Sequence, residues 1–270
     1  MHAAYKGKSY SNPPPTGRLR LLTLARDLRR RKSREKQSLF VAEGVRSVEE
    51  LLKSPLVIRG ILMAPQLDGA PRGMILRQSI AERGIETSGV SELDFRSAAE
   101  TESPQGVLAI AEIPVRKLGQ VSGRDGLRIL VLDAVQDPGN VGTILRTAAA
   151  LGADATVALP GTVDFWNAKV IRGAMGASFH HHCMHVGFDE LTGFLDAEGV
   201  ELWGTGASGL PVDEVTAPPK LALAVGNEGA GLSSSVRDRV TQVVSLPISE
   251  SIESLNVAVA AGILLYQLRK

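Results

Sequence analysis

The 270-residue sequence has one cysteine, few aromatic residues and no long apolar run. Because Cys183 is alone, an intramolecular disulfide and any site built from several thiolates are excluded, which suits a reducing compartment. The apolar runs are about five or six residues long, against roughly 20 for a membrane-spanning helix. Residues 1–17 also lack the apolar block of a signal peptide. We therefore expect a cytoplasmic protein with no membrane partner and no redox chemistry.

Charge is unevenly distributed, although the formal net charge is only +1. Residues 1–115 carry 18 Lys and Arg against 13 Asp and Glu, and residues 116–270 carry 12 against 16. Nine basic residues, seven of them Arg, lie between positions 18 and 36. Such a run is either a nucleic-acid footprint or a solvated helix face, and the planar fork of Arg suits phosphate oxygens. The predicted nucleic-acid contacts are Arg29, Arg30, Arg31, Lys32 and Arg34.

Hydrophobic periodicity divides the first half of the chain into three parts. Residues 1–17, with three consecutive prolines, are expected to form a flexible arm. Residues 18–113 are predicted to form a small α/β domain. Its expected helices are 19–31, 45–53 and one from about Ser91, and its expected strands are 39–41, 58–63, 85–87 and 107–113. Residues 114–126, rich in glycine and polar side chains, are interpreted as a linker that adds little to a core.

Residues 127–270 continue the α/β rhythm and are expected to form a second domain around a parallel sheet. The expected strands are 128–133, 155–159, 201–205, 221–225 and 242–246. Their short apolar runs lack polar alternation, as is typical of strands covered on both faces by helices. Residues 254–268 have the apolar spacing of a final helix.

Two motifs suggest ligand sites that their context does not support. Residues 204–209 match G-x-G-x-x-G, but Pro211 breaks the helix that a dinucleotide site requires, so we expect only a glycine loop that could approach a nucleoside. The cluster His180–His185 could ligate zinc only through His181, Cys183 and His185, which share one side of a strand. No distant carboxylate or thiolate motif supports that set, and we expect an ordinary strand and no metal.

Three segments carry polar residues that apolar packing does not explain. Asn140 and Arg146 lie on a mostly apolar helix, and Asn140 could instead be its N-cap. Glu228 lies in a glycine loop after a buried strand, which could also be a tight turn. Ser254 and Asn256 precede the last helix, where Ser254 could be an ordinary N-cap.

The three segments share a position in the expected fold. All follow the carboxyl ends of parallel strands, where open α/β sheets bind ligands. Together they supply backbone amides, an acid, an arginine and amide or hydroxyl side chains, without a cysteine or Ser-His nucleophile or a phosphate loop. This inventory suits binding of a polar nucleoside and positioning of a hydroxyl group.

The same segments resemble the three motifs of the SpoU/TrmH family of SPOUT-class RNA ribose 2′-O-methyltransferases. The matching residues are Asn140-Val-Gly142 with Arg146-Thr147, then Gly226-Asn-Glu228-Gly-Ala-Gly231, then Leu246-Pro247 with Ser254-Leu255-Asn256-Val257. Order and spacing agree throughout. The resemblance extends over residues 18–270, because 40–44 and 103–106 are similar to the family's N-terminal substrate-binding domain.

The resemblance implies a SPOUT domain with a C-terminal trefoil knot, S-adenosyl-methionine as cofactor and a homodimer whose sites are completed by the neighbouring chain. It places Gly226, Leu246 and Leu255 at cofactor-contacting positions, with Thr205 and Gly206 in a loop near the same pocket. The implied partner is RNA rather than DNA, with 23S rRNA favoured. A tRNA methyltransferase and a non-catalytic RNA-binding or ribosome-assembly protein are the alternatives.

The resemblance also assigns the catalytic residues. Arg146 matches the family's catalytic arginine, and because a guanidinium gives up its proton only in strong base and is a poor general base, we expect it to clamp a phosphate and stabilise the developing alkoxide. Asn140, Glu228, Ser254 and Asn256 match positions that orient Arg146 and the substrate or shape the cofactor pocket. Glu228 is alternatively expected to pair with Arg146.

Overall fold

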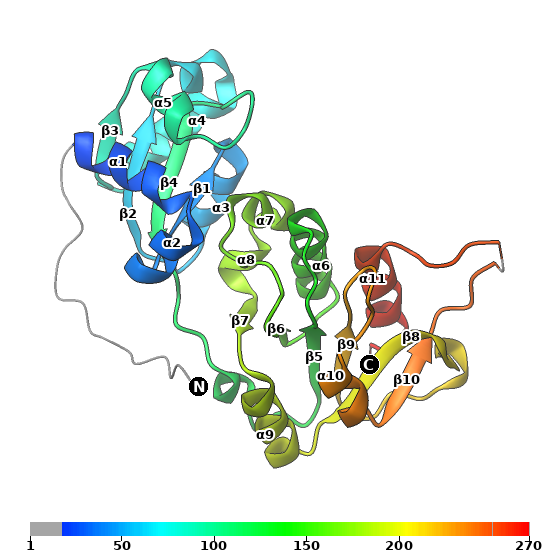
Figure 1. Ribbon diagram of the computed structural model, residues 1–270. Coiled ribbons are helices and arrows are strands. Elements are labelled where there is room, and N and C mark those ends of the chain that lie inside the picture. Colours follow the sequence, from blue (N-terminus) through cyan, green and yellow to red (C-terminus); the bar gives the residue numbers. More distant parts are fainter. Residues whose placement is uncertain (1–17, 250, 270) are drawn as a thin grey trace.

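The computed structural model describes residues 18–249 and 251–269, which form two sheets with flanking helices (Figure 1). The predicted arm at 1–17 lies outside the described residues. The first sheet runs β1 (Leu39–Glu43), β4 (Val107–Glu112), β2 (Ile58–Met63) and β3 (Thr87–Gly89). β4 is antiparallel to β1 and β2, and β3 is parallel to β2. Its helices are α1 (Arg18–Leu28), α2 (Arg31–Gln37), α3 (Val45–Lys53), α4 (Pro71–Glu82) and α5 (Glu92–Ala98).

The second sheet has six strands, all parallel, as the sequence predicts. In spatial order they are β10 (Gln242–Ser245), β8 (Glu201–Pro211), β9 (Lys220–Val225), β5 (Leu127–Leu132), β6 (Ala155–Ala158) and β7 (His182–His185). Its helices are α6 (Pro138–Ala150), α7 (Ala168–Ala174), α8 (Ala177–His180), α9 (Phe188–Glu198), α10 (Ser234–Arg239) and α11 (Val257–Gln267). The α/β fold class is confirmed.

The predicted helix 19–31 ends early, at Leu28, and a second helix that the sequence did not predict, α2, begins at Arg31. The backbone of Arg30 is extended, with φ −89° and ψ 129°, and it separates α1 from α2. Arg34 folds back across this break, and its Nη1 donates to the carbonyls of Leu28 and Arg29, each at 2.9 Å. These carbonyls at the end of α1 thus gain a donor that a continuous helix would not need.

The expectation that residues 114–126 add little to a core is wrong. Leu118 and Val121 lie on one turn of 3-10 helix, η2 (Leu118–Val121), and are buried against the second sheet. Arg116 donates to the carbonyls of Ser178 and Phe179. Leu118 and Val121 are three positions apart, so one turn of 3-10 helix places both on the face that packs against the second sheet. The overall composition of the segment does not reveal this.

The expectation of a glycine loop around Thr205 and Gly206 is also wrong, because β8 continues through these residues to Pro211. A Cβ at Gly209 would lie 2.6 Å from the carbonyl carbon of Val244, where the register of β8 against β10 shifts. Glycine here allows close backbone approach within the sheet. No helix opens at Gly209, whereas a dinucleotide site requires one there.

One of the three apolar clusters of the described residues contains side chains from both domains. Phe40 of β1 is fully buried, and its ring centroid lies 4.6 Å from that of Trp166 and 5.8 Å from that of Phe179, both from the second domain. Aromatic contacts of this kind fix two surfaces against each other. Within the described residues, every helix is too short or too polar to cross a membrane.

Candidate active site

The three segments that the sequence singled out come together at the carboxyl ends of β9, β10 and β5 (Figure 1). A cavity of about 390 Å³ opens there, within the size range of small-molecule sites. Its predicted lining residues are Thr205, Gly206, Gly226, Glu228, Leu246, Ser254, Leu255 and Asn256. Val225, Val244, Val257 and Leu264 contribute further apolar lining.

The loop that follows β9 is held closed on itself. The backbones of Asn227 and Gly231 form an antiparallel bridge, and Asn227 Oδ1 accepts hydrogen bonds from the amides of Gly229 and Ala230, each at 3.0 Å. Asn227 Nδ2 donates to the Ala134 carbonyl at the end of β5. A Cβ at Gly226 would lie 2.3 Å from the carbonyl carbon of Gly231, so only glycine allows this fold of the loop.

The helix caps differ from the alternatives suggested by the sequence. Asp137, not Asn140, caps α6 and accepts the amide of Asn140 at 2.7 Å. Asn256, not Ser254, caps α11, and its Oδ1 accepts the amides of Ala258 and Val259. Because Asp137 meets the capping requirement of α6, the Asn140 side chain is available for other contacts.

The side chain of Asn140 joins all three motifs. Asn256 Nδ2 donates to Asn140 Oδ1 at 2.9 Å, and Asn140 Nδ2 donates to Glu228 Oε1 at 2.9 Å. The three residues are 116 and 88 positions apart in the chain. We call this chain of two hydrogen bonds, from Asn256 through Asn140 to Glu228, the relay. It orients the Glu228 carboxylate at the cavity wall and connects the three separate motifs into one site.

Arg146 is placed differently from the other predicted catalytic residues. It is exposed on α6, it does not line the cavity, and its side chain forms no hydrogen bond or ion pair with another described residue. Within one chain the described residues show no ion pair between Glu228 and Arg146, and Glu228 accepts a hydrogen bond from Asn140. The next residue, Thr147, lies under α11, where its Cγ2 would be 3.2 Å from a Cβ at Gly262.

The cavity fits a cofactor that combines a flat ring with polar groups. Its backbone at Gly226 and Gly231 has no side chain that would fill the space, and Leu246 and Leu255 offer apolar surface for a ring. Glu228 and Glu253 add carboxylates that suit a cationic group.

Comparison with known proteins agrees with this geometry. Residues 128–266 match the model of the SpoU rRNA Methylase family, and residues 23–109 match an MRM3-like substrate binding domain. The chain belongs to the SpoU rRNA methylase family. It is 39% identical over 243 residues to the 23S rRNA (guanosine(2553)-2'-O)-methyltransferase RlmP of Bacillus subtilis, covering 90% of this chain and 93% of the relative.

Two solved methyltransferase structures are similar to this chain over nearly their whole length. The methyltransferase AviRb from Streptomyces viridochromogenes, in complex with AdoMet, has a TM-score of 0.81 and 26% identity, covering 92% of this chain and 96% of that one. An AdoMet-bound rRNA methyltransferase from Sinorhizobium meliloti has a TM-score of 0.79 and 27% identity, covering 92% and 93%. The predicted family, RNA methyltransferase activity and S-adenosyl-methionine cofactor are confirmed.

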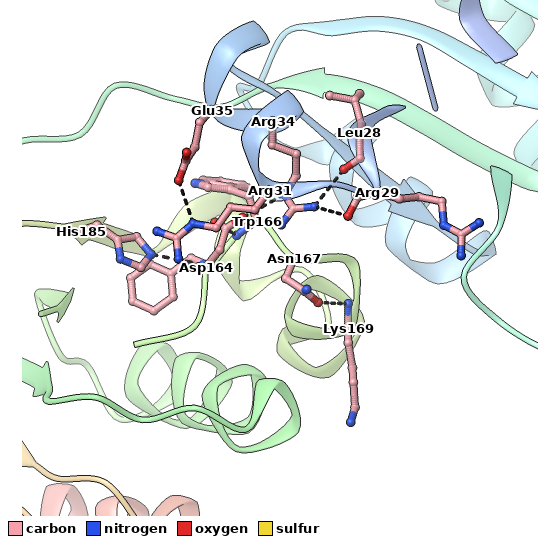
Figure 2. Close-up of polar contacts among 11 residues, drawn as sticks. Leu28, Arg29, Arg31, Arg34, Glu35, Asp164, Trp166, Asn167, Lys169 and His185 are labelled. Atoms are coloured by element: carbon pink, nitrogen blue, oxygen red, sulfur yellow. Dashed lines mark hydrogen bonds and ion pairs between the residues drawn. The ribbon is translucent and has the colours of Figure 1, made fainter. Parts of the chain in front are cut away.

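The basic run is only partly an exposed surface. Arg34 is 3% exposed, and its guanidinium forms an ion pair with Asp164, with Nη2 at 2.7 Å and Nε at 2.8 Å from Oδ2 (Figure 2). The prediction of Arg34 as an RNA contact is therefore wrong. Arg29, Arg30, Arg31 and Lys32 are exposed, with Arg30 paired to Asp27 and Arg31 paired to Glu35.

Two residues near the site were missed in the sequence. Lys169 of α7 is 58% exposed, with its Nζ 3.9 Å from Oδ2 of the α6 cap Asp137. Asp164, in the loop before α7, is the buried partner of Arg34. A lone lysine and a lone aspartate have no local pattern that distinguishes them, since their partners are distant in sequence.

Only His182–His185 of the histidine cluster forms the expected strand, because His180 ends α8 and His181 is the C-cap of that helix. His181 is buried and shares a 2.8 Å hydrogen bond with Thr156, and burial lowers its pKa to about 4. Burial raises the pKa of the Cys183 thiol to about 11. Within residues 18–249 and 251–269, no group of three or more His, Cys, Asp or Glu could hold a metal ion.

Proposed function

We propose that this protein transfers the methyl group of S-adenosyl-methionine to a ribose 2′-hydroxyl of 23S rRNA. The observation that carries the proposal is the relay from Asn256 through Asn140 to Glu228 at the wall of a glycine-lined cavity. The relative from Bacillus subtilis, named for a 23S rRNA guanosine, supports the choice of RNA. Relatives from two Streptomyces species are named for a uridine and an adenosine of 23S rRNA, so the target base is left open.

The chain's own residues hold and orient the reactants. When bound, S-adenosyl-methionine supplies a methyl group that is already electrophilic on its sulfonium. Gly226, Leu246 and Leu255 would hold the cofactor, and Thr205 and Gly206 of β8 form the wall of the cavity beside them. The remaining requirement is to position the 2′-hydroxyl in line and stabilise the oxygen as its proton leaves.

Arg146 supplies positive charge for that step, from a second copy of the chain. It lies outside its own cavity on α6, which packs against α11, and α11 exposes an apolar stripe of Val259, Ile263 and Tyr266, which are 51%, 40% and 49% exposed. Residues spaced by four and three positions form one helix face. An exposed apolar face of this kind is typical of an interface, which supports a homodimer in which Arg146 reaches the neighbouring site. Ser254 completes the cavity wall.

We also propose a cytoplasmic protein, since rRNA is its substrate and its one cysteine is a buried thiol. The trefoil knot of the C-terminal segment and the boundaries 18–113, 114–126 and 127–270 remain predictions. The two family-model matches, at 23–109 and 128–266, fall within the outer pair of these segments.

The test is transfer of labelled methyl from S-adenosyl-methionine to unmodified total RNA that is then separated into 23S, 16S and tRNA fractions. We expect label in 23S rRNA, released as a 2′-O-methyl nucleoside, and at least about a hundredfold less with Arg146→Ala. Arg237→Ala, an exposed arginine of α10, is the matched control and should retain full activity.

Label in the tRNA fraction would mean that the substrate is tRNA rather than 23S rRNA, and the proposed methyl transfer would still hold. Binding of S-adenosyl-methionine by calorimetry distinguishes the remaining outcomes, because a non-catalytic RNA-binding protein should give no heat. Full activity in Arg146→Ala, or loss of cofactor binding in that variant, would contradict its assigned role.

A further inference from the structure

The buried ion pair of Arg34 and Asp164 joins the N-terminal domain to the methyltransferase domain. The two side chains are 4% and 12% exposed, so this pair is far more buried than a surface salt bridge. Asp164 is itself fixed, because its Oδ1 accepts the amide of Trp166 at 2.9 Å while Oδ2 faces Arg34. A buried pair that is hydrogen-bonded on both sides has a defined geometry.

Arg34 also holds the break between α1 and α2. Its Nη1 donates to Leu28 and Arg29 carbonyls, so one guanidinium connects this break to Asp164 (Figure 2). The exposed side chains Arg29, Arg30, Arg31 and Lys32 extend from this same segment, which we call the basic junction (residues 29–32). The position of the basic junction relative to the second domain thus depends on Arg34.

A rigid path connects Asp164 to the cavity. Its loop leads into α7, whose N-cap Asn167 accepts the amide of Lys169. α7 lies close against α6, because a Cβ at Gly142 would be only 2.7 Å from the Val170 carbonyl oxygen. α6 carries Asn140. The basic junction is therefore held in a fixed relation to the site through packed helices rather than through a flexible linker.

We propose that the Arg34–Asp164 pair is a positioning element that preorganises the basic junction for the RNA substrate. This inference rests on the proposed function. The apolar contact of Phe40 with Trp166 holds the two domains together independently, so the ion pair is not needed for the domains to associate. A basic junction that is already ordered loses less conformational entropy when RNA binds.

The test compares steady-state methylation of in-vitro-transcribed 23S rRNA by the wild type, Asp164→Asn and Arg34→Lys at saturating S-adenosyl-methionine. Asn keeps an oxygen for the Trp166 amide, and Lys keeps the charge but presents one donor head instead of a fork. We expect KM for RNA to rise about tenfold in both variants, with kcat and cofactor affinity within about twofold.

The direction of this change separates positioning from simple electrostatics. Asp164→Asn removes a negative charge, which alone would strengthen attraction to RNA. The matched control is Asp68→Asn, which makes the same charge change in an exposed ion pair with Arg77. We expect KM for RNA to be unchanged or lower in the control and higher in Asp164→Asn.

Two results would overturn the proposal. The first is a KM for RNA that is unchanged or lower in Asp164→Asn, which would mean that the pair has no role in RNA binding. A lower kcat at unchanged KM would identify a purely structural pair, because loss of folded protein lowers the apparent kcat alone. Amide hydrogen exchange of residues 28–36 gives a readout without RNA and should become faster in both variants. Slow exchange identical to the wild type would also overturn the proposal.

The proposed function can fail separately. If the wild type methylates no RNA, the proposed function is wrong, and the RNA dissociation constants of the same variants decide on the positioning role. We then expect the same tenfold weakening, about 1.4 kcal/mol, in Asp164→Asn and Arg34→Lys. Equal dissociation constants for all variants would reject it.

Discussion

At the scale of single residues, Asn140 is the most constrained position of the site. Its amide group donates to Glu228 and accepts from Asn256, so both of its polar atoms are used in one orientation. An amide offers a donor and an acceptor side by side on one planar group, whereas an ionised carboxylate only accepts. Neither aspartate nor alanine can replace it without leaving Glu228 or Asn256 without its partner.

Asn140→Asp should reduce methyl transfer by about a hundredfold, because a second carboxylate would face Glu228 at hydrogen-bond distance. Thr143→Ala is the matched control, since Thr143 Oγ1 bonds only the Gly139 carbonyl on the exposed side of the same helix. Single-turnover methylation measures both. Equal rates for Asn140→Asp and the wild type would show that the relay has no role in the reaction.

Residue chemistry was largely predictable from the sequence. Asn140, Glu228 and Asn256 stood out because polar side chains next to buried strands and glycine turns are not needed for packing. Arg34 could not be separated from its basic neighbours, since its burial depends on Asp164, which is 130 positions away. Whether an arginine is buried depends on a partner that can be distant in the sequence.

At the scale of elements, the break between α1 and α2 decides how the basic run is displayed. It leaves Arg29 and Lys32 exposed, and no described acidic side chain pairs with either. Arg30 and Arg31 have acidic partners within the same segment. The local positive potential therefore depends most on Arg29 and Lys32.

Arg29→Glu and Lys32→Glu should each weaken binding of 23S rRNA and reduce the slope of log affinity against log salt by about one. Arg237→Glu, an exposed arginine of α10, makes the same charge change in the other domain and should leave the slope unchanged. Fluorescence anisotropy at several salt concentrations measures the slopes. Equal slopes in all proteins would identify the basic run as a solvated helix face.

The hydrophobic period of the sequence predicted the positions of most helices and strands, but it did not predict the residues at which they begin and end. The strands of the second sheet and α11 lie near the predicted ranges, but β8 runs on to Pro211 and α11 begins at Val257 rather than Ser254. Helix ends depend on which side chain reaches the free amides, and here Asn256 does so. The extension of β8 depends on pairing with β10, which local sequence does not encode.

At the scale of the whole molecule, the proposed homodimer rests on the exposed apolar face of α11. Ile263→Glu should convert the proposed homodimer into a monomer, because a charge in an apolar interface loses its hydration. Light scattering after size exclusion measures the mass. Met74→Glu, a substitution of an exposed apolar residue of α4 in the first domain, is the control and should not change the mass.

The monomeric variant should also lose methyl transfer while retaining cofactor affinity within a few-fold, because Arg146 would no longer reach a neighbouring cavity. A fully active monomer would contradict the shared site. A wild type that is already monomeric would contradict the homodimer itself.

The sequence alone determined the α/β class, the three polar segments and the family, because these follow from hydrophobic period and from side-chain chemistry that is local in the chain. Tertiary structure decided which of these residues act together. The relay through Asn140 and the burial of Arg34 join groups that are 88 to 130 positions apart. Such contacts form only when packed strands and helices bring distant segments within hydrogen-bond distance, and this requirement leaves no local pattern in the sequence.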